Sequence, residues 1–173
     1  MKIDFATIPT LVGPVVLLAH DDALIGLEFA DHPDRARALR TRIERYLGPF
    51  ETREARDPAG AASRLASYFA GDRLALDRQK VELHGTEFER AVWKQLCRIP
   101  AGTTLSYTQL ATRVGSPKGS RAAGQANGRN PVALFVPCHR VIAADGTLGG
   151  YGGGLDRKRR LLAHEGALEP ELV

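Results

Sequence analysis

Two helix starts stand out in the second half of the chain, because each is specified by residues at fixed spacing. Thr86 is followed three positions later by Glu89, and Ser106 is followed in the same way by Gln109. In such a capping box the hydroxyl accepts a hydrogen bond from a first-turn amide, while the longer side chain reaches back to the amide of the cap residue. Residues 81–173 are therefore predicted to form a mainly helical domain.

A helix-turn-helix is predicted directly after the second of these starts. The helix that Ser106 begins is expected to end at Gly115, which suits the left-handed position after a helix. Ser116 and Pro117 predict the next start, as a cap residue and a proline at the first helical position. This second helix is expected to run to Asn127, so that two short helices are joined by a tight turn.

The second of these helices carries few large side chains. Ser120, Ala122 and Gly124 surround one long side chain, Arg121. Helices that read the major groove normally display several long polar side chains. A bare helix instead permits close approach of the backbone, which suits a minor groove and one inserted side chain. Small residues also occur where two helices pack tightly, so this pattern alone leaves both interpretations open.

The first 80 residues predict a small α/β domain with a supporting role. Two apolar runs, residues 15–19 and 23–29, flank three polar residues and predict a β-hairpin. Apolar residues recur at helical spacing over residues 34–47 and 61–70, which predicts two helices.

The whole chain is accordingly expected to be of the α/β (α+β) class, with a supporting domain over residues 1–80 and a second domain over residues 81–173. A length of 173 residues suits one such pair of small domains. No apolar run reaches the roughly 18–20 residues that span a bilayer. The N-terminus also lacks the apolar core of a signal peptide.

Cys138 is the candidate nucleophile. It follows the apolar run 132–136, which is predicted to be a buried strand ending at Pro137, and its neighbour is His139. The thiolate is the reactive form of cysteine, and a nearby imidazole or cation favours it. A buried cysteine is also often a small hydrophobic residue with no reactivity. The other cysteine, Cys97, lies beside the apolar stripe of the helix that follows Thr86 and is predicted to serve packing.

Two cysteines provide no disulfide framework, which favours a reducing, cytoplasmic setting. Neither they nor the five histidines show the spacing of a metal site, and we expect neither a metal nor a cofactor. The excess positive charge lies in residues 113–160, which carry nine basic and two acidic side chains. Because phosphate neutralisation provides affinity, a nucleic acid is the natural partner, although a solvated basic surface would have the same composition.

Six motifs occur in one order over residues 82–167. They are Ser106-Tyr107 with Gln109-Leu110-Ala111, Pro117-Lys118 with Arg121-Ala122, Ala126 to Pro131, Val136 to Ile142, Gly150-Tyr151 with Gly153-Gly154, and Leu161 to Gly166. In these motifs and their spacing the chain resembles the O6-alkylguanine-DNA alkyltransferases (methylated-DNA–protein-cysteine methyltransferases). Residues 1–80 resemble that family only in length and general α/β character.

The resemblance implies a catalytic site for DNA repair. Cys138 would take the alkyl group from O6 of guanine in a single irreversible displacement, so that each molecule acts once. His139 would act as the base through a bridging water, with Glu165 orienting the imidazole. Asn130 would brace the turn that presents the cysteine, and Tyr107 would donate a hydrogen bond to the guanine ring as negative charge develops there.

The resemblance also implies how the protein holds double-stranded DNA. The helix that carries Ser120, Ala122 and Gly124 would lie in the minor groove. Arg121 would fill the gap left by the flipped nucleotide, because O6 lies inside the base pair and the base must leave the stack. The pocket for the alkylated guanine would be built from the backbone of Cys138, Val141, Tyr151 and Gly152. Gly152 replaces a small side chain common in the family, so the loop is expected to be looser. A monomer is expected, with cooperative assembly on DNA left open.

Three other functions remain to be distinguished from alkyl transfer. Alkyltransferase-like proteins bind DNA lesions without catalysis, but they lack the cysteine, so Cys138 argues against this alternative. A helix-turn-helix regulator would display a major-groove recognition helix. A cysteine hydrolase would need an oxyanion hole and would turn over many times.

Overall fold

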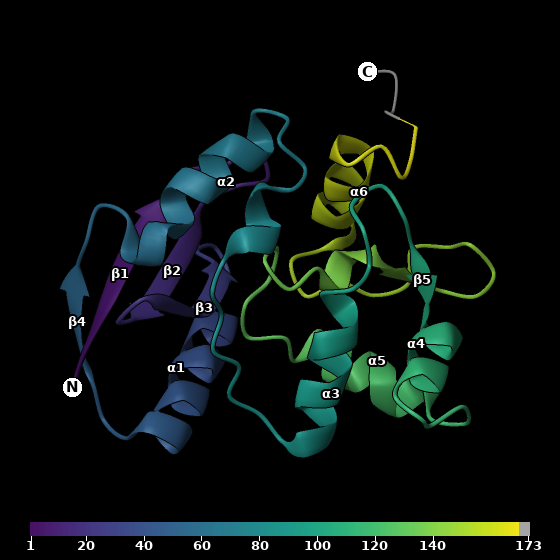
Figure 1. The fold of residues 1–173 in the computed structure, drawn as a ribbon, viewed down its shortest axis with the longest axis horizontal. Helices are drawn as coiled ribbons and strands as arrows, with labels where there is room; N and C mark the ends of the chain where they lie inside the picture. Colours follow the sequence, from purple (N-terminus) through teal and green to yellow (C-terminus); the bar gives the residue numbers. More distant parts are fainter. Residues whose placement is uncertain (170–173) are drawn as a thin grey trace. The chain divides into compact units, whose positions relative to one another are not determined.

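In a computed structural model that describes residues 1–169, the chain divides into two compact units (Figure 1). The first unit combines Met1–His84 with Pro131–Phe135, and the second holds Gly85–Asn130 and the chain from Val136 onward. The division thus follows His84 rather than residue 80. The first unit contains a sheet with helices, and the second consists mainly of helices, which confirms the α/β (α+β) class. Among the described residues, no helix is long and apolar enough to cross a bilayer.

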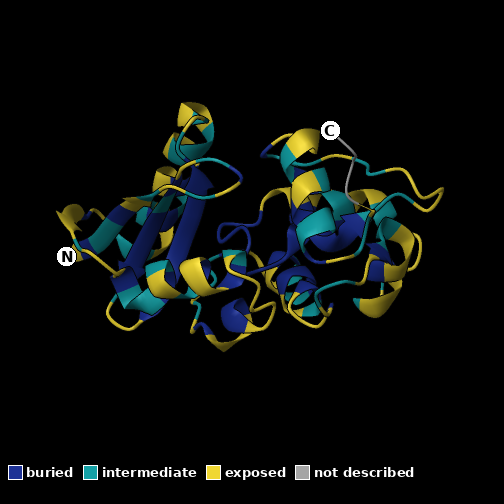
Figure 2. Cartoon of the chain, turned by 90° about the horizontal axis from the view of Figure 1, so that it is seen from above, coloured by how far each residue is buried: buried dark blue, intermediate teal, exposed yellow. Residues whose placement is uncertain are grey.

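The first unit is built on a four-stranded sheet with the order β3-β2-β1-β4. Its strands are β1 (Lys2–Ile8), β2 (Val15–His20), β3 (Ala23–Phe29) and β4 (Glu51–Glu54). The hairpin expected over residues 15–29 is confirmed, since β2 and β3 pair antiparallel. β3 is buried along its whole length, as the dark blue strands of Figure 2 show. The strand is apolar except for Gly26 and Glu28, and the buried carboxylate of Glu28 accepts a hydrogen bond from Arg35 Nε at 3.0 Å.

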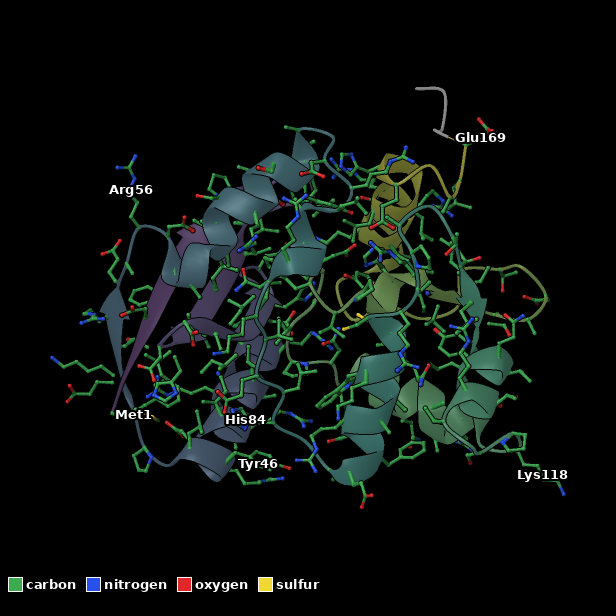
Figure 3. The ribbon with its side chains drawn as sticks, viewed as in Figure 1. Met1, Tyr46, Arg56, His84, Lys118 and Glu169 are labelled. Carbon is green, nitrogen blue, oxygen red and sulfur yellow. The ribbon has the colours of Figure 1, made fainter. Side chains whose placement is uncertain are left out.

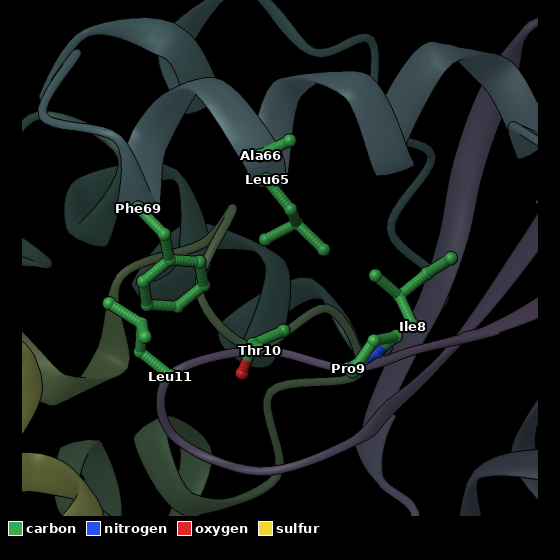
Figure 4. A pocket seen from close by; sticks show the side chains of 7 residues that line it. All are labelled: Ile8, Pro9, Thr10, Leu11, Leu65, Ala66 and Phe69. Atoms are coloured by element: carbon green, nitrogen blue, oxygen red, sulfur yellow. The ribbon is translucent and has the colours of Figure 1, made fainter.

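Helices α1 (Pro33–Leu47) and α2 (Ala61–Phe69) confirm the two helices predicted for the first unit. Short 3-10 turns occupy Pro58–Gly60 and Ala75–Arg78. α1 contributes Leu39 and Ile43 to an apolar core with residues of the sheet, and each such buried side chain stabilises the fold by about 1.5–3 kcal/mol. An apolar pocket of about 270 Å³ lies between the end of β1 and α2, with Leu65 and Phe69 in its lining (Figure 4).

The second unit is made of short elements. They are α3 (Glu87–Leu96), β5 (Leu105–Ser106), α4 (Tyr107–Arg113), α5 (Ser120–Gly128), the 3-10 turn η3 (Cys138–Arg140), β6 (Val141–Ile142) and α6 (Leu155–His164). Both predicted capping boxes are confirmed. Thr86 Oγ1 accepts from the amide of Glu89 at 3.2 Å, and the carboxylate of Glu89 accepts from the amide of Thr86 at 3.0 Å.

The start of α5 was predicted wrongly. The helix begins at Ser120, and residues 116–119 form a turn that the amide of Gly119 closes on the carbonyl of Ser116 at 2.8 Å. Proline is as favourable at the second position of a β-turn as at the first position of a helix. Glycine at position 119 permits the observed turn, because a Cβ there would lie 2.3 Å from the hydroxyl of Ser116. The exposed side chain of Lys118 marks this turn in Figure 3.

The strand predicted over residues 132–136 is also absent. The segment is buried, but it makes an isolated bridge from Val132 to Leu27 and then turns, with Leu134 at a φ of 71°. An apolar run indicates burial, whereas a strand also needs a partner along its length. The prediction that Cys97 serves packing was also wrong. The residue directly follows α3, which ends at Leu96, and it is exposed.

Candidate active site

Cys138 begins η3 and is buried, with 7% of its surface exposed. Two amide side chains, one in the last turn of α5 and one two residues after the helix, hold the backbone on either side of it. Asn130 Nδ2 donates to the carbonyl of Val136 at 2.7 Å, and Asn127 Nδ2 donates to the carbonyl of Cys138 at 3.3 Å. Trp93 Nε1 in turn donates to the carbonyl of Ala126 at 2.8 Å, which ties α5 to α3. The position of the thiol is therefore set by α5.

His139 and Glu165 form a buried pair. His139 Nε2 lies 2.8 Å from Glu165 Oε1, and neither side chain is exposed. Burial lowers the pKa of His139, so the imidazole is neutral near pH 7. Burial would raise the pKa of Glu165, but hydrogen bonds from His139 and Arg140 outweigh it and hold that pKa well below its usual value. A carboxylate only accepts hydrogen bonds, so Nε2 carries the hydrogen and Nδ1 is the basic atom.

Nδ1 of His139 is buried and makes no hydrogen bond within residues 1–169. A buried acceptor without a partner is costly, so its retention points to a role in proton transfer. The thiol of Cys138, the preceding residue of the same 3-10 turn, is the acidic group next to the imidazole in the chain. The arrangement matches a nucleophile, a base and an orienting carboxylate.

Arg140 was missed in the sequence, where it counted only as part of the basic segment. Its guanidinium binds both oxygens of Glu165, from Nε at 2.9 Å and from Nη2 at 2.8 Å, and Nη1 donates to the carbonyl of Ile99 at 2.6 Å. The side chain is 3% exposed. Such a two-pronged contact suits guanidinium and keeps the carboxylate ionised. The available signal was its position directly after Cys138 and His139, within an otherwise apolar segment.

Lys158 was missed in the same way. It is fully buried on α6, and its Nζ donates to the carbonyls of Val141 at 2.6 Å, Gly150 at 3.0 Å and Leu148. Burial lowers its pKa to about 8. Position 158 lies three and four residues before two buried leucines of α6, so helical spacing already placed it on the buried face. Asn127 is a further residue that the sequence reading did not assign to the site.

Tyr107 lies between the glycine-rich loop and α5. Its hydroxyl donates to the carbonyl of Gly150 at 3.4 Å, and a Cβ at Gly149, which has a φ of +70°, would lie 2.9 Å from its ring. A Cβ at Gly124 would contact the same ring at 3.4 Å. Burial raises the pKa of the phenol, with the charge of Cys138 adding to the effect, so Tyr107 stays protonated and can donate.

The other predicted residues fall into two groups. On α5, Arg121 and Ala122 are exposed, Ser120 and Gly124 are half-buried, and the opposite face packs through Ala123 and Ala126. Near the thiol, Val141 is buried beside Lys158, while Tyr151 and Gly152 are half-buried in the turn before α6. Hydrogen bonds thus connect Tyr107 to Gly150 of the glycine-rich loop, and Lys158 to both Gly150 and Val141. The side chain of Arg121 is exposed. In residues 1–169 no cluster of His, Cys, Asp and Glu is suited to hold a metal.

The chain is similar in sequence to known proteins over nearly its whole length. Residues 87–167 match the family described as "6-O-methylguanine DNA methyltransferase, DNA binding domain". A methylated-DNA–protein-cysteine methyltransferase of Mycobacterium tuberculosis is 41% identical over 171 residues, which cover 97% of this chain and 95% of the relative. The chain belongs to the methylated-DNA–protein-cysteine methyltransferase family.

A further relative and a solved structure extend this likeness. A protein of the same name from Salmonella typhimurium is 42% identical over 162 residues, covering 93% of this chain and 94% of the relative. A crystal structure of the Mycobacterium tuberculosis protein in complex with DNA has a TM-score of 0.76 and 38% identity, and covers 96% of this chain and 94% of that one. The resemblance drawn from the motifs is confirmed, and it extends through residues 1–80.

Proposed function

We propose that the protein repairs DNA by moving the alkyl group of O6-alkylguanine irreversibly to Sγ of Cys138. The observation that carries this proposal is a buried basic nitrogen, without a hydrogen bond in the described residues, on the residue that follows a buried thiol. Cys138 is followed by His139, whose Nδ1 makes no hydrogen bond in the described residues, while Nε2 lies 2.8 Å from Glu165 Oε1. Family membership supplies the substrate class.

Burial disfavours the thiolate, so the buried thiol of Cys138 needs an acceptor for its proton. The proton passes through a bridging water to Nδ1 of His139. Glu165 stabilises the resulting imidazolium, and Arg140 keeps Glu165 ionised through both of its oxygens. The thiolate then attacks the alkyl carbon, and the bond from that carbon to O6 breaks. Its electron pair stays on the guanine, which regains a proton, so that the thiol proton replaces the alkyl group overall.

Tyr107 assists the departure of the guanine. Because its phenol remains protonated, it can turn its one hydrogen from the carbonyl of Gly150, 3.4 Å away, to the ring as negative charge develops. The pocket for the base is formed by the backbone of Cys138 with Val141, Tyr151 and Gly152. The thioether formed on Cys138 has no route for departure, so each molecule reacts once and no cofactor is required.

The partner is double-stranded DNA, and we place α5 in its minor groove. The exposed Arg121 and Ala122, with the half-buried Ser120 and Gly124, allow the backbone of α5 to approach the duplex closely. Arg121 occupies the space of the extruded nucleotide, whose extrusion costs a few kcal/mol and costs less for a mispaired base. One chain carries every group of the site, so we propose that a monomer acts. A nucleophilic thiol requires a reducing compartment that holds DNA, which supports the cytoplasm.

The proposal is tested by intact mass after incubation with a duplex that contains O6-methylguanine. One added methyl group, mapped to Cys138, is expected in the wild type and in Cys97→Ala. Cys138→Ala should gain no mass. An unmodified wild type that still binds the duplex would instead support the lesion-binding alternative, which family membership does not favour.

A further inference from the structure

Asn127 is a buried polar residue on the inner face of α5. It lies four residues after Ala123 and directly after Ala126, and only 5% of its surface is exposed. Residues three or four apart on a helix share a face, so these three residues form one buried stripe. Alanine is the better helix former and brings no polar group that needs a partner. An asparagine in this stripe therefore points to a role for its amide other than packing.

The amide of Asn127 can face Cys138 in one orientation only. A backbone carbonyl accepts hydrogen bonds and cannot donate, so the amide nitrogen must be turned toward the carbonyl of Cys138, which lies 3.3 Å away. The amide oxygen, Oδ1, is buried and makes no hydrogen bond within residues 1–169. The hydrogen bond from Trp93 to the carbonyl of Ala126 fixes α5 on α3 one residue before Asn127 (Figure 1). The helix that carries the amide is therefore held in place.

Two buried acceptor atoms thus adjoin the residue that carries the thiol. His139 Nδ1 belongs to the residue after Cys138, and Asn127 Oδ1 belongs to the amide that binds the carbonyl of Cys138. Both atoms lack a hydrogen bond within the described part of the chain, and each is costly alone. A buried water typically makes about three hydrogen bonds. One water can therefore satisfy both acceptors and still bond to the thiol.

We propose that Asn127 is a positioning residue whose Oδ1 accepts the second hydrogen of the water that links Cys138 to His139. The inference rests on the proposed function, because that water carries the proton of the thiol. Before the transfer the water accepts from the S–H group and donates its two hydrogens to Nδ1 and Oδ1. The thiol proton then bonds to the water oxygen, and the electron pair of the S–H bond stays on sulfur. The hydrogen that faced Nδ1 passes to the imidazole, while the hydrogen on Oδ1 does not move.

The contact with Oδ1 favours the ionised pair over the neutral one. Hydrogen bonds in a chain polarise one another, so a water that donates to Oδ1 has a more electron-rich oxygen. That oxygen accepts from the S–H group, a weak donor, before the transfer and from the imidazolium after it. The stronger acceptor stabilises the charged donor more. Asn127 therefore helps to form the thiolate without touching the substrate.

The variant Asn127→Leu replaces the amide with an apolar side chain of similar shape. All measurements are made in Cys97→Ala, so that Cys138 is the one thiol present. The rate of iodoacetamide alkylation, followed by intact mass, reports the fraction of the thiol that is ionised. At pH 7 the variant is expected to react about threefold to tenfold more slowly, the factor that one hydrogen bond contributes. The difference should vanish toward about pH 10, where the thiol ionises in both proteins.

The pH dependence separates this role from packing, because a distorted or blocked site would react more slowly at every pH. Gln125→Leu, which removes an exposed amide from the same helix, is the matched control and should react like the wild type throughout. The ionisation of neighbouring groups is common to all variants and cancels in the ratio of their rates. These groups are His139, Arg140, Glu165, Tyr107, Lys158, and the Glu89–Arg129 pair where α3 and α5 meet.

Several outcomes would overturn the inference. An iodoacetamide rate in Asn127→Leu that equals the wild-type rate would do so, as would a loss by the same factor at every pH. A loss confined to free O6-benzylguanine would assign Asn127 to the substrate pocket instead.

A crystal structure of the wild type tests the inference even if Asn127→Leu does not fold. We expect one water within hydrogen-bonding distance of both Asn127 Oδ1 and His139 Nδ1. An Oδ1 that is bonded to the thiol itself, or to another protein group, would overturn the inference. Failure of the proposed function has a different signature, namely a wild type that reacts with iodoacetamide but accepts no benzyl group on Cys138.

Discussion

Arg140 and His139 both bind Oε1 of Glu165, at 2.8 Å each, so neighbouring residues of one turn share a single carboxylate oxygen. One of them is a permanent cation and the other is the base of the proposed reaction. Arg140 therefore keeps Glu165 ionised whether or not His139 holds a proton. This pairing lets the carboxylate both fix the tautomer of the resting imidazole and stabilise its protonated form.

Replacing Glu165 with Gln is expected to slow alkyl transfer by about 100-fold, the lower end of what general-base catalysis provides. A neutral amide stabilises the imidazolium less, so the pKa of the Cys138 thiol should rise and the pH–rate profile should shift upward. Stopped assays on O6-methylguanine duplexes over a pH series measure both effects. Binding of the same duplex by Cys138→Ala and by the double variant with Glu165→Gln should be equal. An unchanged pH–rate profile would contradict the role of Glu165.

Arg121→Ala is expected to slow repair of duplex DNA at least about tenfold more than reaction with free O6-benzylguanine. The free base needs no extrusion, whereas extrusion from a duplex costs a few kcal/mol that the inserted side chain offsets. Rates on both substrates, measured side by side, provide the comparison. Arg113→Ala, an exposed arginine at the end of α4, serves as the charge-matched control. Equal losses on the two substrates would remove the extrusion role from Arg121.

Arg140→Met is expected to lower the free energy of unfolding by about 3–5 kcal/mol, because it removes the guanidinium that binds both oxygens of the buried carboxylate of Glu165. Urea unfolding, followed by circular dichroism, measures this loss. Arg98→Met removes an exposed arginine and should change stability by less than about 0.5 kcal/mol. A loss in Arg140→Met no larger than that of the control would show that the buried contacts of Arg140 contribute little.

The buried Lys158 is expected to make stability depend on pH. The pKa of Lys158 is about 8 in the folded protein and near 10.5 when unfolded, so the unfolded chain binds more protons between these values. The free energy of unfolding of the wild type, relative to Lys158→Met, should therefore increase from pH 8 to pH 10.5, by at most on the order of 3 kcal/mol. Urea unfolding at several pH values measures the difference. A difference that stays level or decreases would mean that burial does not depress this pKa.

Features that depend on near neighbours in the chain could be predicted from the sequence. Both capping boxes, the hairpin of β2 and β3, and the bounds of α1 follow from hydrogen bonds and apolar spacing within a few residues. Ser116-Pro117 is a place where near neighbours in the chain did not predict the structure. Its local pattern fits a helix start and a turn equally well, and the structure has the turn, which the amide of Gly119 closes on the carbonyl of Ser116.

The candidate residues Cys138, His139 and Glu165 were found through motifs, but their electrostatics depend on groups that lie far from them in the chain. Arg140 reaches Ile99, 41 positions away, and Lys158 reaches Val141, 17 positions away. In the sequence both residues belong to a basic segment that suits DNA, whereas in the folded protein both are internal. Burial is set by which elements pack together, and a cation removed from water changes its pKa and its partners. The charge and the order of the motifs therefore pointed to DNA repair. Only the packed structure separated exposed cations such as Arg121, which are available to DNA, from the buried Arg140 and Lys158.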